Sequence, residues 1–143
     1  MIIVAFPDAC DALTASLGQA LGADNVFDGP PPRLIGLSGL AVGATREDVS
    51  SDFTVDPADL SGGTAEGISI TCLAWSADGR VVFKPHRDAV RALVVAAETR
   101  IAADRTLGGA VDTCDVTGGT WTQEQTGEGA LVTCEFRISL RRF

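Results

Sequence analysis

Apolar residues recur at helical spacing in two segments of the chain. Across residues 8–21 they stand three and four positions apart, which predicts an amphipathic helix with Asp8 as N-cap and Gly22 as its stop. A longer helix is predicted over residues 86–104, where Pro85 suits the first turn. The apolar positions of the two helices are Cys10, Leu13, Leu17 and Leu21, then Val90, Leu93, Val94, Ala97 and Ile101. Each helix has one face to bury, so both need a partner surface.

Alternation with a period of two predicts strands over residues 66–76, with at least one buried face, and over residues 129–142, where apolar and polar residues alternate strictly. In the last strand Val132, Cys134, Phe136, Ile138 and Leu140 share one side, which predicts one face on a core and one face in water. Weaker strands are predicted over 34–42 and 110–117, and residues 118–128 are expected to be a polar connection. The order of these elements predicts one α+β domain over residues 1–143, a mostly antiparallel β-sheet with two α-helices packed on one face.

A very short apolar pair, Val26–Phe27, is followed by Asp-Gly and three prolines. Because proline cannot extend a β-ladder, Pro30, Pro31 and Pro32 are suited to protecting a sheet edge, and a plain surface turn is the alternative. Residues 44–64 are expected to be a long acidic loop. Its carboxylates do not follow the ligand spacing of a calcium-binding loop, so no metal site is expected there.

Composition narrows the class of protein. The chain has 143 residues and a formal net charge of −8, which argues against tight binding to nucleic acid. No apolar run reaches the roughly 20 residues that a membrane helix needs, and the opening MIIVAFP lacks the basic region of a signal peptide. Cys10, Cys72, Cys114 and Cys134 are widely spaced and are expected to be core thiols in a reducing compartment. A disulfide between Cys72 and Cys134 is the alternative.

Residues that could perform catalysis are few. The single histidine, His86, falls at a helix start and is expected to be a surface or capping residue. Asp88 is near it in sequence, but positions i and i+2 of a helix do not face each other. No nucleophile elbow, phosphate-binding loop or dinucleotide fingerprint is present. We therefore expect no enzyme activity, no catalytic residue, no cofactor and no metal.

Three stretches resemble the tail terminator proteins of long-tailed bacteriophages, also called tail completion or head–tail joining proteins. They are the end of the first helix with Val26-Phe27-Asp28-Gly29-Pro30-Pro31-Pro32, the close of the second helix at Thr106-Leu107-Gly108-Gly109-Ala110-Val111, and the closing strand Gly129-Ala130-Leu131-Val132-Thr133-Cys134-Glu135-Phe136-Arg137-Ile138. The resemblance covers nearly the whole chain, but it rests on element order and loose motifs. The long acidic segment at 44–64 departs from some relatives.

The resemblance implies a structural virion protein of the tail and neck region, assembled in the host cytoplasm. Such subunits form a ring, typically hexameric, on the head-proximal end of the tail tube, where they stop tube polymerisation and prepare head–tail joining. The implied partners are other copies of the chain, the tail tube protein and a head–tail connector or stopper protein. Genomic DNA passes through without tight binding, and no membrane is involved.

Two alternatives stay open: a head-closure or other minor tail protein of the neck, and, from another class, a small-molecule-binding α+β domain. The second predicts a pocket between helix and sheet that holds His86 or a pair of carboxylates. For the ring, a head-to-tail contact is expected between the acidic residues of 47–66 and the arginines of the last strand of a neighbour. The residues expected at subunit or partner interfaces are Phe27, Pro30, Pro31, Pro32, Trp121, Arg137, Arg141 and Arg142. Those expected to face the channel are Asp52, Asp56, Glu124 and Glu128.

Overall fold

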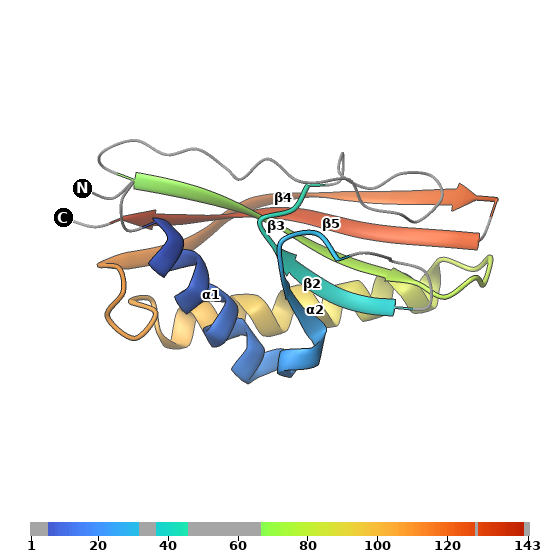
Figure 1. Cartoon of the computed structure of the whole chain (residues 1–143). Coiled ribbons are helices and arrows are strands. Elements are labelled where there is room, and N and C mark those ends of the chain that lie inside the picture. Colours follow the sequence, from blue (N-terminus) through green and yellow to red (C-terminus); the bar gives the residue numbers. More distant parts are fainter. Residues whose placement is uncertain (1–5, 32–36, 46–66, 128, 142–143) are drawn as a thin grey trace.

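Two helices pack on one face of a five-stranded sheet in a computed structural model that describes residues 6–31, 37–45, 67–127 and 129–141 (Figure 1). The strand order is β1-β2-β3-β5-β4. The predicted α+β class is therefore confirmed. The elements are α1 (Phe6–Leu21), η1 (Ala23–Asn25), β1 (Val26–Asp28), β2 (Leu37–Val42), β3 (Gly67–Ala77), α2 (Lys84–Ala103), β4 (Thr113–Thr126) and β5 (Gly129–Arg141).

The first helix ends where the sequence predicts and begins slightly earlier. Asp8 lies in the first turn of α1 and not at its N-cap, because the helix already starts at Phe6. Gly22 stops the helix with a φ of 89°, and its N–H donates to the carbonyl of Gly18 at 2.9 Å. The chain then enters β1, which pairs with β2 in parallel, the one pair among the described strands that is not antiparallel.

The second helix runs from Lys84 to Ala103, within two residues of the prediction, and Pro85 is in its first turn. Its end is held by the carboxylate of Asp104, which accepts hydrogen bonds from the Thr106 N–H at 3.2 Å and the Gly108 N–H at 2.9 Å. The Thr106 hydroxyl donates to the same carboxylate at 2.9 Å. This turn brings the chain back to the sheet as β4.

The prediction of a polar connection at residues 118–128 is wrong. Residues 113–126 form one continuous strand, β4, which pairs with β5 along its whole length and has a register shift between Val116 and Gly118. The reason is that β4 is an edge strand with much of its second half exposed, so its polar residues need no apolar alternation. Thr and Trp still favour extended backbone there.

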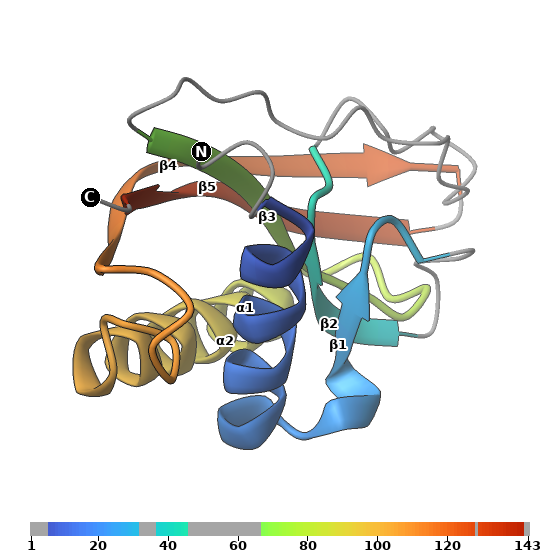
Figure 2. The same ribbon diagram turned by 60° about the vertical axis from the view of Figure 1, so that its left-hand side comes forward.

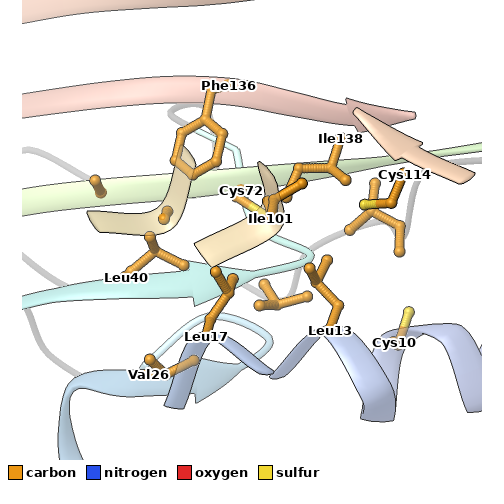
Figure 3. Close-up of a cluster of buried hydrophobic side chains, with 14 of the residues drawn as sticks. Cys10, Leu13, Leu17, Val26, Leu40, Cys72, Ile101, Cys114, Phe136 and Ile138 are labelled. Carbon is orange, nitrogen blue, oxygen red and sulfur yellow. The ribbon is translucent and has the colours of Figure 1, made fainter. Parts of the chain in front are cut away.

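The main core lies between the helices and the sheet. In Figure 3, Leu13 and Leu17 of α1 point toward Leu40 of β2, while Phe136 and Ile138 extend from β5. All five side chains are buried. The predicted apolar side of the last strand is therefore confirmed, because Val132, Cys134, Phe136, Ile138 and Leu140 all belong to this core.

The opposite face of the sheet is not the wet face that the last strand predicts. Thr133 is buried there, and Leu73 and Trp75 of β3 are fully buried in a second apolar cluster, against which Phe27 packs. The cause lies in β3, which is apolar at both alternating sets of positions, a pattern typical of a strand buried on two sides. On the polar side of the last strand, Arg137 and Arg141 are exposed, while Glu135 and Ser139 are partly buried.

The four cysteines are free, buried thiols, as the sequence predicts, and the alternative of a Cys72–Cys134 disulfide is wrong. Burial raises the pKa of Cys10 to about 11 and that of Cys134 to about 11. Burial also raises the pKa of Cys114 to about 12 and that of Cys72 further still. Thiols in this state are poor nucleophiles and pack as small apolar groups.

Candidate functional site: the seam between α2 and β4

Residues of helix α2 and of the edge strand β4 face each other across a space, here called the seam, which is hollow at one end. The hollow has a volume of about 620 Å³. Its helix side includes Val94, Glu98 and Ile101, and its strand side includes Val116, Gly119 and Trp121. An ion pair between Arg105 and Asp115 stands at this end. We call this the open end of the seam.

The shape of the open end follows from residues of β4. An added Cβ at Gly119 would lie 3.0 Å from the carbonyl oxygen of Glu135 and 3.2 Å from Cβ of Phe136, so only glycine leaves the strand undisturbed. Two positions on, Trp121 pairs with Cys134 and so shares the helix-facing side of the sheet. It finds no full cover there, because 48% of its surface is exposed. A large apolar side chain thus borders an unfilled space.

The other end of the seam is filled by polar contacts. Arg87 of α2 donates to the side-chain oxygen of Gln123 at 3.0 Å, and the Gln125 amide donates to the carbonyl of Val81 at 2.6 Å. The N–H of Ala130 also donates to the carbonyl of Arg80 at 2.7 Å. We call this the closed end of the seam, because β4, β5 and the turn before α2 are held together there.

Beneath the closed end lies His86, and the expectation of a surface histidine is wrong. Its side chain is 1% exposed, and Nδ1 shares a hydrogen bond of 2.8 Å with the Ser76 hydroxyl. Nε2 lies 3.1 Å from a carboxylate oxygen of Asp78, an ion-pair distance without hydrogen-bond alignment. Asp88, the nearby acid in the sequence, instead pairs with Lys84.

The Ser76–His86–Asp78 cluster contains the residue types of a hydrolytic triad but not its setting. Ser76 is 6% exposed, and none of the three side chains borders the hollow at the open end of the seam. A nucleophilic hydroxyl must reach its substrate, so burial of this kind favours a structural role. The cluster ties the end of β3 to the first turn of α2.

The predicted interface residues fall on two opposite edges of the sheet and on its second face. Phe27 of β1 is half-buried, with its ring centroid 5.6 Å from that of Trp75, and Pro30 and Pro31 follow it on the same edge. Trp121 lies on the β4 edge. Arg137 and Arg141 are exposed on the face opposite the helices, while Pro32 and Arg142 lie outside the described residues.

Of the residues expected to face a channel, only Glu124 can be placed. It is half-buried on β4, opposite Leu131, and therefore on the face away from the helices. Asp52, Asp56 and Glu128 lie outside the described residues, as does most of the acidic loop at 44–64. The expected contact between that loop and the last strand of a neighbour is therefore not addressed by the structure.

The sequence did not indicate where the hollow lies or which residues contact His86. The turn Ser76-Ala77-Asp78-Gly79 stands just before the helix and is the signal that could have identified the His86 partners.

Among the described residues, no group of three His, Cys, Asp or Glu side chains is arranged to hold a metal ion. In the same part of the chain, neither helix combines the length and apolar character of a membrane span. No family model matches the chain, and no curated protein matches it.

Proposed function

We propose that this chain is the subunit of a phage tail terminator ring, in which copies assemble head to tail through the two unlike edges of the sheet. The observation that carries the proposal is the position of Trp121, a half-exposed anchor on an edge strand opposite the β1 edge with Phe27 and its prolines. A head-to-tail contact joins two different surfaces of the same subunit, and repetition of that contact closes a ring. The order of helices and strands, which underlies the resemblance to this family, agrees with the proposal.

In this role the subunit caps the head-proximal end of the tail tube, stops its polymerisation and offers a surface for head–tail joining. Its partners are the tail tube protein and a connector or stopper protein, and its place is the tail and neck of the virion. No catalysis, cofactor or membrane is needed. A hexamer would carry six times the formal charge of −8, which suits a channel through which DNA slides without binding.

The small-molecule alternative predicts a pocket with His86 or a pair of carboxylates. The hollow does lie between helix and sheet and is bordered by two carboxylates, Glu98 and Asp115, but Asp115 is paired with Arg105 and His86 is at the other end of the seam. These contacts favour assembly over ligand binding as the use of the hollow. The other alternative, a head-closure or minor tail protein of the neck, shares the virion setting and is separated from the proposal by the experiment.

The test is electron microscopy of the purified protein together with tails made in its absence. We expect rings with a central opening, a mass several times the 14.8 kDa of one chain, and irregular or overlong tubes when the protein is missing. A particle that stays monomeric at all concentrations, with or without tail tubes, would overturn the proposal. Tubes of normal length that fail only to join heads would assign the neck alternative instead.

A further inference from the structure

We infer that the open end of the seam is the docking site for a second copy of this chain, which presents the edge formed by α1, η1 and β1. The inference rests on the proposed ring and specifies which two surfaces meet in it. Three features of the described residues lead to it: the edge strand with its half-exposed tryptophan, the charge of the two edges, and the surface shape of the two edges.

The first feature is the position of β4 at the edge of the described sheet. The strand has 14 residues, and in the described sheet it pairs only with β5. Its second half, from Gly119 to Thr126, contains no proline and no basic residue that would discourage pairing with another chain. Trp121 stands in this half beside the hollow. Half-exposed tryptophans beside a hollow are typical anchors of protein interfaces.

The second feature is the opposite charge of the two edges. The described residues 6–31 contain four aspartates, all exposed, and no lysine or arginine; we call this the acidic edge (Asp8, Asp11, Asp24 and Asp28). Helix α2 contains four basic residues, of which Lys84 pairs with Asp88 and Arg100 donates to Ser16 and Gln19 of α1, so Arg87 and Arg91 remain for the seam side. Arg87 contacts β4 and Val94 borders the hollow, so Arg91, which lies between them on the same helical stripe, also belongs to the seam side. The hollow itself is bordered by Glu98 and by Arg105 in its ion pair with Asp115, so Arg87 and Arg91 lie beside the hollow, on the side of the closed end, and not in its wall.

The third feature is the surface shape of the two edges. The acidic edge has a shallow hollow of about 330 Å³, bordered by small residues of α1 (Ala15 and Gly18) together with Ala23 and Val26. Figure 2 shows α1 beside β1 and β2, while α2 lies farther toward β5 and β4. A half-exposed tryptophan on one edge and a hollow with small residues on the other allow each copy to contact the next in the same way. This is the geometry of a heterologous contact, and it needs no symmetry within the interface.

The experiment measures assembly of the full chain by sedimentation velocity at low and high salt. Trp121→Ser should weaken association about 30-fold or more at both salt concentrations, as expected for an anchor residue. Arg91→Glu should weaken it on the order of tenfold at low salt and much less at high salt. Asp11→Arg, made alone, should weaken association in the same salt-dependent way. The double variant Arg91→Glu with Asp11→Arg should associate more strongly than either single variant.

Two matched controls separate this contact from others. Val82→Ser removes an exposed apolar side chain outside the hollow, and Arg137→Glu reverses an exposed arginine on the opposite face of the sheet. Both should leave association within about twofold of wild type. Circular dichroism of each variant would verify that it is folded before its assembly is compared.

The outcomes are distinct. Rings that are lost with Trp121→Ser and Arg91→Glu, and regained in the double charge swap, support the inference. Rings that persist in these variants, or that are lost only with Arg137→Glu, overturn it while leaving the ring itself intact. A wild-type chain that never assembles overturns the proposed function, and the docking site with it.

Discussion

The two ends of the seam between α2 and β4 are built from the same helix and the same strand, yet one is closed and the other open. At the closed end, side chains from the strand reach the helix and the turn before it, as Gln123 and Gln125 do. At the open end the strand has Gly118 and Gly119 and a register shift, so these two positions have no side chain to fill the space, which Trp121 borders without closing it. A surface for a partner can therefore form where small residues follow a bulge in an otherwise regular strand and leave a space unfilled.

The largest effect is expected at the floor of the open end. Phe136 is 2% exposed and belongs to the main core (Figure 3), so Phe136→Ala should lower the free energy of unfolding by about 2–5 kcal/mol. Leu93 of α2 is only partly buried, so Leu93→Ala should cost less. Chemical denaturation of both variants measures the difference.

The control for these variants is Val95→Ala, because Val95 is 51% exposed and should change stability by about 0.5 kcal/mol or less. Arg100 would be a poor control, since it donates to the Ser16 hydroxyl at 3.1 Å and to the Gln19 side chain at 2.7 Å and so joins α2 to α1. If Phe136→Ala unfolds at the same denaturant concentration as Val95→Ala, the open end does not rest on the core.

The sequence predicted the helices and the apolar side of β5 well because their patterns depend on one buried face each. It failed for β4, whose second half is polar on an exposed edge and therefore has no apolar period to detect. It also failed for His86, because the partners Ser76 and Asp78 come from the end of another element. The small-molecule alternative expects a pocket between helix and sheet, but the place of the hollow could not be predicted, since it depends on how far the bulged strand stands from a helix that only the fold brings near it.

At the closed end, the sharpest test is a pair of glycines in one hairpin. Gly129 has a φ of 123°, and an added Cβ would lie 2.6 Å from the backbone of Gly79 in the turn before α2. Gly129→Ala should therefore lower stability by about 1–3 kcal/mol through backbone strain, and the clash adds to this. At Gly127 an added Cβ meets nothing within 4 Å, so Gly127→Ala is the matched control with a small effect.

Thermal unfolding of the two glycine variants gives the answer directly. Equal melting temperatures would mean that the contact between the hairpin and the turn does not hold the closed end. A loss confined to Gly129→Ala would place that contact among the features that keep this end of the seam filled.

The smallest effect is expected from lowering the pH, which tests one carboxylate at each end of the seam. A hydrogen bond from the Arg80 N–H is the main cause that lowers the pKa of Asp78 at the closed end. At the open end the Thr106 hydroxyl is the main cause that lowers the pKa of Asp104. Because both carboxylates have a lower pKa in the folded chain, their stabilising effect is complete above a pH of about 4 and is lost as the pH falls through the folded values.

Unfolding measured from about pH 5 to pH 2 should therefore show a shallower loss of stability in Asp78→Asn and in Asp104→Asn than in wild type. Thr106→Val removes a donor to Asp104 and should reproduce part of the change at the open end alone. Both carboxylates are exposed to solvent, so the effects are small and high salt should reduce the contribution of the charges around them. Identical slopes in wild type and in the double aspartate variant would show that neither end depends on its carboxylate, and the difference between the ends would then lie in packing alone.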